Sequence, residues 1–320
     1  MLVLVPAVPH SPGVGPQAKP LVTDGSWMDL FWQLLKNGVV LGLLYGLFAY
    51  GLSLIIAVTR VFHFAHGFTL AFSALLFWNL YESAGMPFVV AAPLTIAAAA
   101  AVGVASEAWI YGPIRNRGGS EMVILVASLL LLVLGQNLAV LHWGASVKVV
   151  TKVRPFLDWG ISVGTVSIRG WDVAVFVTAL LGFALLYVLL TKTQLGLRLR
   201  AVGDNPERAA SLGINLKHSY RLVFAIGSGL AAVPALLLAS RNPILPAMGF
   251  EVLVLAFVAI VVGGIGSMPG ALLGGLVVGV TEQLAVLYLP TEWGQFVLFA
   301  LLFGFIIVKP YGLLPAKSGT

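Results

Sequence analysis

The sequence predicts an all-α integral membrane protein, a polytopic bundle of about eight to ten transmembrane helices. Three observations support this fold class. Of the 320 residues, 59% are hydrophobic and only 9% are charged, whereas a soluble domain carries about 25% charged residues. Apolar runs of bilayer-spanning length recur along the chain. Residues 192–221 hold six of the 18 Lys and Arg, and a segment this charged is excluded from hydrocarbon.

The basic segment 192–221 also sets the predicted orientation. Short positive loops remain in the cytoplasm, so nine spans with this loop inside place the N-terminus outside and the C-terminus inside. All 18 cations taken together show the same bias. Eleven fall inside, including the six of this segment: Arg60, Arg115, Arg117, Lys192, Arg198, Arg200, Arg208, Lys217, Arg221, Lys309 and Lys317. The other seven fall outside.

The N-terminal residues are predicted to form a tail, followed by the membrane domain. Residues 1–26 contain five prolines, which favours an extended or disordered segment over 1–28. A second interpretation is that translation begins at Met28. The membrane domain is expected to occupy residues 29–315.

The first half of the chain contains four apolar runs, at 32–58, 61–81, 87–110 and 122–142. In the first run, Gly38, Gly42 and Gly46 recur at every fourth position. This spacing predicts a ridge of small residues suited to close helix packing.

The second half contains five apolar runs, at 171–190, 222–238, 252–262, 271–287 and 294–308. The loop 143–170 between the halves has β-branched runs broken by Pro and Gly, which predicts short strands or a hairpin on the periplasmic side. The count of spans runs from eight to ten because 61–81 and 250–270 are also compatible with re-entrant segments.

The composition excludes several chemistries. The chain has no Cys, its five His lack zinc-binding spacings, and no phosphate-binding loop occurs. We therefore expect no catalytic residues, metal or cofactor in this chain, and any ATP and Mg to be used by a partner. The net charge of +6 comes from loops between spans and does not indicate nucleic-acid binding.

Polar side chains within apolar runs are candidates for a translocation path. His63 and His66 lie in the segment FHFAHG, and Glu282 is the deepest carboxylate; ionisable groups in such positions commonly mark substrate or ion routes. The alternative for the histidines is a place at the cytoplasmic interface, satisfying backbone groups near Gly67. Glu107 and Glu251 are expected near the interfaces.

Glycine-rich backbone at membrane depth is the second indication of a translocation path, because such backbone is tolerated only when it is buried in protein or lines a cavity. FAHG in the first half and GGIGSMPG in the second are such interruptions, and paired interruptions point to a transporter's substrate path. The candidates are Gly67, Gly263, Gly264 and Gly266. The alternative is a tight cytoplasmic turn with glycines for close packing.

The basic loop contains the pattern E-x-A-x-x-x-G. Asn205 and Pro206 are typical of a helix start, and Glu207 falls in the first turn, near the positive helix end. Together with Arg208, Ala209 and Gly213 they predict one short cytoplasmic helix that ends at glycine. Such a helix suits docking into a partner's groove; the alternative is a solvated loop.

Several of these stretches resemble the branched-chain amino acid ABC transporter permease family. They are NGVVLGLLYGLFAYGLSLIIAVTRVFHFAHGFTLAFSALLFWNLYE (37–82), GPIRNRGGSEMVILVASLLLLVLGQNLAVLHWG, GLRLRAVGDNPERAASLGIN, GGIGSMPGALLGGLVVGVTEQL and KPYGLL. The third is similar to the E-A-A-x-x-x-G coupling loop of ABC importers. His63 stands where the family usually has Asn, and Arg208 where that loop has Ala.

The resemblance covers residues 30–315 and implies a bacterial inner-membrane permease without enzymatic activity. It implies pairing with a second permease, two cytoplasmic ATPases and a periplasmic solute-binding protein. The implied substrate is a branched-chain or other apolar amino acid, with urea or short amides as the alternative. A stand-alone secondary transporter, the rival class, would need intramembrane ion pairs, and no buried Asp–Arg or Glu–Lys pair is evident from the sequence.

Overall fold

The computed structural model describes residues 24–290, 293–309 and 311–314. Its helices are α1 (Asp24–Thr59), α2 (Ala65–Phe77), α3 (Phe88–Ser106), α4 (Gly112–Asn116), α5 (Glu121–Trp143), α6 (Arg154–Leu157), α7 (Gly170–Lys192), α8 (Gln194–Asp204), α9 (Pro206–Ser211), α10 (Leu216–Arg241), α11 (Met248–Gly263), α12 (Met268–Ala285) and α13 (Gly294–Val308). Two π-helical turns, η1 (Trp78–Ser83) and η2 (Glu107–Tyr111), extend α2 and α3.

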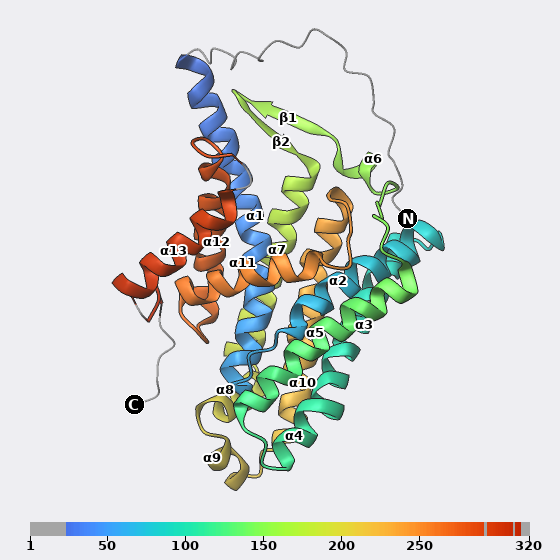
Figure 1. The fold of residues 1–320 in the computed structure, drawn as a ribbon, viewed down its shortest axis with the longest axis vertical. Coiled ribbons are helices and arrows are strands. Elements are labelled where there is room, and N and C mark those ends of the chain that lie inside the picture. The colour runs from blue at the N-terminus through green and yellow to red at the C-terminus, as the bar shows by residue number, and fades with distance from the viewer. Residues whose placement is uncertain (1–23, 291–292, 310, 315–320) are drawn as a thin grey trace, which may run out of the picture.

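Among the described residues, six helical stretches are long and apolar enough to cross a membrane, which confirms the polytopic all-α fold. They are Trp27–Thr59, Phe88–Asn116, Glu121–Trp143, Gly170–Lys192, Leu216–Arg241 and Met268–Ala285. Met248–Gly263 and Phe296–Val308 are apolar but shorter. Two predicted spans, 61–81 and 252–262, contain the short helices α2 and α11, and α11 lies across the direction of α1 (Figure 1).

Three predicted boundaries differ from the structure. Of the predicted tail, residues 1–23 lie outside the described part of the chain, while residues 24–28 are the first turns of α1. The third span continues through η2 and α4 to Asn116, so Arg115 lies in a helix. The basic segment 192–221 holds α8, α9 and the start of α10, where one short helix was predicted.

The missed helix α8 is amphipathic. The hydroxyl of Thr193 caps its start by accepting a hydrogen bond from the Gly196 amide at 3.1 Å. Leu199 and Val202 are buried, while the two arginines in the helix face outward. Leu195 and Ala201 are partly buried beside the two buried residues. The two arginines and the surrounding positive charge hid this short apolar face in the sequence.

The contact between α1 and α12 confirms the predicted glycine ridge and identifies its partner. A Cβ atom built on Gly42 would lie 2.8 Å from the carbonyl oxygen of Gly275, and one built on Gly279 would lie 2.3 Å from the amide nitrogen of Gly42. Only residues without a side chain allow the two backbones to come this close. The two helices run antiparallel, with Gly38 opposite Gly279 and Gly46 opposite Leu272.

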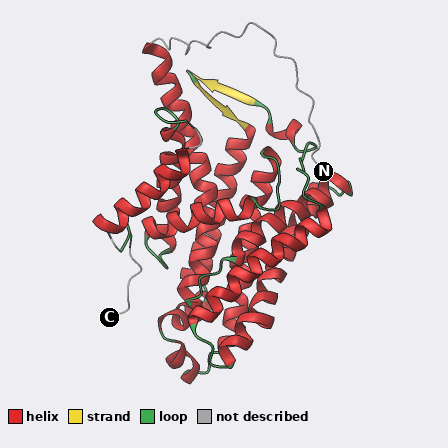
Figure 2. Cartoon of the chain, viewed as in Figure 1, coloured by secondary structure: helices red, strands yellow, loops and turns green. Residues whose placement is uncertain are grey.

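The two long loops lie at opposite ends of α1. The predicted hairpin is present as β1 (Gly160–Val163) and β2 (Val166–Arg169), paired antiparallel, and its Ser167 amide donates to Gln33 at 2.9 Å. At the other end, a Cβ on Gly203 of α8 would meet the Ala57 carbonyl at 2.8 Å. Figures 1 and 2 show the hairpin and the α8–α9 unit at the two ends of the helical body.

This arrangement agrees with loops 143–170 and 192–221 emerging on opposite sides of a membrane. Which end faces the cytoplasm stays a prediction from the charge bias.

We expect Gly279→Ala to destabilise the protein by about 1–3 kcal/mol, because the added methyl group would overlap the backbone of α1. The measurement is the melting temperature of the detergent-purified chain. Gly304→Ala in α13 is the matched control, since a Cβ there meets nothing within 4 Å. Equal melting temperatures for the two variants would contradict the close contact.

Candidate functional site

The short helix α9 begins and ends where the sequence predicts. The Asn205 side chain accepts a hydrogen bond from the Arg208 amide at 2.9 Å, and Pro206 occupies the first helical position. After Leu212 the chain turns at Gly213, whose φ of +82° lies in the left-handed region that favours glycine.

The two faces of α9 differ in burial. Ala209 is 2% exposed against the rest of the molecule, whereas Glu207 and Arg208 face outward. Leu212, just beyond the helix, is 80% exposed. The unit therefore presents a charged and apolar tip. Its role in coupling stays a prediction.

The two candidate histidines lie inside the protein. His63 is 1% exposed and its Nδ1 is 2.9 Å from the hydroxyl of Tyr111. His66 is fully buried, with its ring 4.5 Å from that of Phe48. Protein encloses both rings, and a position at the depth of the cytoplasmic interface stays a prediction. Their place in a translocation path stays a prediction.

The glycine of FAHG meets a glycine that the sequence analysis did not single out. A Cβ on Gly67 would lie 2.7 Å from the Gly249 carbonyl oxygen. This contact joins the starts of α2 and α11, the two short helices. Gly249 lies in the first turn of α11. The one sequence signal for its role was its position directly after the proline-bearing turn 242–247.

Gly263, Gly264 and Gly266 form the turn between α11 and α12. Gly264 and Gly266 have φ of +116° and +76°, and a Cβ on Gly263 would overlap the Gly270 backbone. The C-terminal segment closes over this turn, with the Leu314 amide donating to the Gly263 carbonyl at 2.9 Å. The geometry is that of the tight, closely packed turn. Lining of a path by these glycines stays a prediction.

Glu282 lies in a cavity of about 280 Å³ with Tyr45, Glu251 and apolar residues of α10, α11 and α13. Its Oε2 atom is buried and has no hydrogen-bond partner among the described residues. Glu251 is exposed; its expected position near an interface stays a prediction. We call this space the Glu282 cavity.

A buried ion pair that the sequence did not reveal lies beside that cavity. Lys36 Nζ is 2.6 Å from Asp172 Oδ2, and Arg241 Nη1 is 3.7 Å from Asp172 Oδ1. Asp172 is only 4% exposed. No such pair was evident from the sequence, because the partners come from α1, α7 and α10 and are far apart along the chain.

A second cavity, of about 240 Å³, adjoins this ion pair and is mostly polar. Its lining includes Asn37, Asp172, Arg241 and Gln283. Three residues, Tyr45, Leu238 and Asn242, line both this space and the Glu282 cavity. We call it the Arg241 cavity.

Glu107 forms a second pair at the opposite end of the bundle. It is 3% exposed and accepts a hydrogen bond from Arg115 at 2.7 Å. Its expected position near a membrane interface stays a prediction. The Arg115 guanidinium also stacks on Tyr220 at 4.3 Å from the ring centre. These contacts join α4 to η2 and α10.

At the hairpin end, the loop 143–170 is tied down through Glu82. Burial raises the pKa of this carboxyl, but hydrogen bonds from the Thr151 hydroxyl and the Thr151 and Lys152 amides outweigh it and hold the pKa below its usual value. The loop is also bridged to the turn before α11 by paired hydrogen bonds between Lys148 and Ile244.

The comparisons agree with the fold and with one another. The model of a family described as "Branched-chain amino acid transport system / permease component" matches residues 34–306. The high-affinity branched-chain amino acid transport system permease protein BraD of Pseudomonas aeruginosa is 30% identical over 295 residues, or 89% of this chain and 95% of BraD.

A second sequence relative and one solved structure extend the comparison. The corresponding permease protein LivH of Salmonella typhimurium is 31% identical over 299 residues, covering 89% of this chain and 95% of LivH. The solved structure of PsaBC from Streptococcus pneumoniae in complex with Fab matches 90% of this chain and 97% of that chain at a TM-score of 0.50. The identity there is 13%, so this likeness concerns the fold alone.

We expect Asp172→Asn to destabilise the protein toward the lower end of the roughly 3–5 kcal/mol typical of a broken buried pair, because it leaves Lys36 without its carboxylate. The measurement is again the melting temperature in detergent. Asp158→Asn, an exposed aspartate in the loop before β1, is the control. A melting temperature unchanged from the wild type would show that the pair contributes nothing.

Proposed function

Since the chain belongs to the family of branched-chain amino acid transport system permease components, we propose that it is the transmembrane permease subunit of an ABC importer. The proposed substrates are branched-chain or other apolar amino acids, and the proposed location is the bacterial inner membrane. In this proposal the chain provides the path and the mechanical coupling, and ATP with Mg is consumed by a partner ATPase.

The observation that carries this proposal is the α8–α9 unit. It stands at one end of the helical body, where α8 packs on the end of α1 through Gly203. Its tip leaves Glu207, Arg208 and Leu212 uncovered. An exposed leucine beside charged residues, on a short capped helix, suits insertion into a groove of a partner protein.

The proposed partners follow from this surface and from the family. Two cytoplasmic ATPases would contact α9, a second permease would complete the path, and a periplasmic solute-binding protein would deliver substrate at the hairpin end. A force applied at α9 reaches α1 and α10 directly, because α8 packs against both.

A stand-alone ion-coupled transporter is the second candidate, and the buried Lys36–Asp172 pair is the observation that favours it. Ionisable pairs of this kind can couple ion and substrate movement. The two candidates differ in whether an ATPase binds this chain.

The deciding experiment is a mild-detergent pull-down of the tagged chain from its native membrane. We expect a Walker-motif ATPase and a second permease to co-purify, and Glu207→Arg to lose the ATPase because it reverses a charge on the exposed face of α9. Glu121→Arg, an exposed glutamate at the start of α5, is the charge-matched control. A homo-oligomer without ATPase would overturn the importer and favour ion coupling.

The orientation gives a further prediction. A cysteine placed at Lys152 in the hairpin loop should react with a membrane-impermeant maleimide added from the periplasmic side. A cysteine placed at Lys217 should react only after the membrane is permeabilised. The chain has no native Cys, so the background is clean. The reverse labelling pattern would invert the topology.

A further inference from the structure

The Glu282 cavity and the Arg241 cavity together have two chemically different halves. They meet at Tyr45 and Asn242, which line both. Each is about 240–280 Å³, so the pair falls within the roughly 300–1,000 Å³ typical of small-molecule sites. A ligand at their border would contact both halves.

Asp172 has one cationic neighbour in the Arg241 cavity and one beside it. Arg241 lines the cavity together with Asp172, whereas Lys36 lies outside the lining and approaches the carboxylate more closely, at 2.6 Å. Arg241 stacks on Trp171 at 4.6 Å from the ring centre and is 3.7 Å from Asp172 Oδ1, which has no hydrogen-bond partner among the described residues. The Arg241 guanidinium is therefore available to a carboxylate, the anion that its planar fork fits.

The Glu282 cavity carries the opposite charge and most of the apolar wall. Glu251 and Glu282 are its two ionisable carboxyls, and the buried Oε2 of Glu282 lacks a partner in the described structure. A buried carboxylate oxygen without a partner is costly unless a ligand supplies a donor. The apolar wall consists of aliphatic side chains, among them Leu238, Val252, Leu255, Val258 and Leu298.

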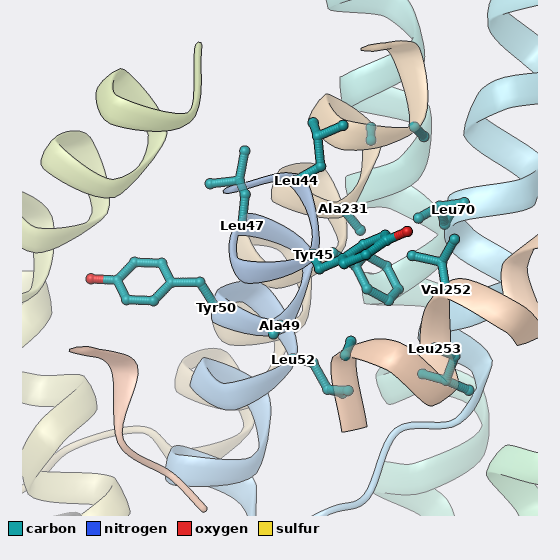
Figure 3. Packing of buried hydrophobic residues seen from close by; sticks show 14 of the residues in the cluster. Leu44, Tyr45, Leu47, Ala49, Tyr50, Leu52, Leu70, Ala231, Val252 and Leu253 are labelled. Atoms are coloured by element: carbon teal, nitrogen blue, oxygen red, sulfur yellow. The ribbon is translucent and has the colours of Figure 1, made fainter. Parts of the chain in front are cut away.

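The α1–α12 contact places these groups at one level of the bundle. Gly279 packs between Gly38 and Gly42, so Glu282 and Gln283, one turn further along the antiparallel helix, lie beside the turn of α1 that holds Lys36. Figure 3 shows Tyr45 leaving α1 on the side of Val252, opposite to Tyr50. Tyr45 thus lies between α1 and the wall of the Glu282 cavity.

We propose that the border of these two cavities binds a free aliphatic α-amino acid as its zwitterion. Arg241 binds the α-carboxylate, Glu282 binds the α-ammonium group, and the aliphatic wall of the Glu282 cavity holds the side chain. This inference rests on the proposed function and adds to it a site within this chain, with Arg241 and Glu282 as the residues that select for both charges.

The test pairs the removal of each protein charge with the removal of the ligand charge that it faces. Binding of leucine, 3-methylbutylamine (which lacks the carboxylate) and 4-methylpentanoate (which lacks the amine) is measured on the detergent-purified full chain up to millimolar concentration. We expect the wild type to prefer leucine to either analogue by about ten- to a hundredfold, the range of one charge-assisted hydrogen bond.

In Glu282→Gln, leucine should lose that factor and its preference over 4-methylpentanoate should vanish, while its preference over 3-methylbutylamine remains. Arg241→Gln should give the reverse pattern, and Arg241→Lys should restore part of the preference. Glu121→Gln, at the opposite end of the bundle, is the control with unchanged binding. Because Glu282→Gln keeps the shape of the side chain, it decides the question even where an Arg241 variant does not fold.

Two results would overturn the site: a wild-type chain that binds none of the three probes, or a Glu282→Gln variant with unchanged discrimination. Either result leaves the proposed function standing if an ATPase co-purifies and the assembled complex takes up leucine. Conversely, zwitterion binding by the chain without any co-purifying ATPase would support the site and reject the importer.

Discussion

The backbone contact between α1 and α12 is the constraint on which the rest of the structure depends. In a bilayer the lipid is as apolar as the side chains, so helices associate through close packing rather than through burial from water. Glycines on both helices bring the two backbones together, and any slip by one residue would place a side chain in the contact. The contact therefore fixes the register of α12 along α1. That register sets Glu282 beside the Lys36 turn and the 263–267 turn beside the end of α1.

The short helices α2 and α11 depend on the same tight packing. Helix α11 has 16 residues and α2 has 13 before η1 continues it, so each by itself is shorter than the about 20 residues that a hydrocarbon core needs. Helix ends at membrane depth are tolerated only where protein encloses their backbone groups. The Gly67–Gly249 contact supplies that enclosure by bringing the two helix starts together. The turn after α11 is enclosed by the C-terminal segment through Leu313 and Leu314, whose amides bond to Val262 and Gly263.

The sequence predicted what local pattern determines and missed what long-range contact determines. Composition, the glycine ridge of α1, the hairpin and the Asn205–Pro206 helix start all have local signals, and all are present. The Lys36–Asp172 pair joins residues 136 positions apart, and Lys36 by itself counted only as one of the seven outside cations. The Glu107–Arg115 pair was missed because the third span was predicted to end at residue 110; its helical continuation through η2 and α4 brings the two side chains together. Gly275 and Gly249 carry no local signal of a contact. They are recognised as contact residues only when the helices that pack against α12 and α11 are known.

Helix α1 connects the two ends of the molecule that have groups available to a ligand or a partner: the two cavities near the hairpin and the α8–α9 unit. α1 carries Lys36 near the hairpin and Ala57 beneath α8, and between them it is held by α12 on one face and by α10 on another, where Gly51 meets Gly227. Energetic coupling over such distances requires packed elements with discrete arrangements. The glycine contacts on two faces of α1 leave no room for a side chain between α1 and its neighbours, so α1 can shift only if α10 and α12 shift with it. Because Lys36 of α1 binds Asp172 of α7 at 2.6 Å, any displacement of α1 relative to α7 would lengthen this charge pair at the hairpin end.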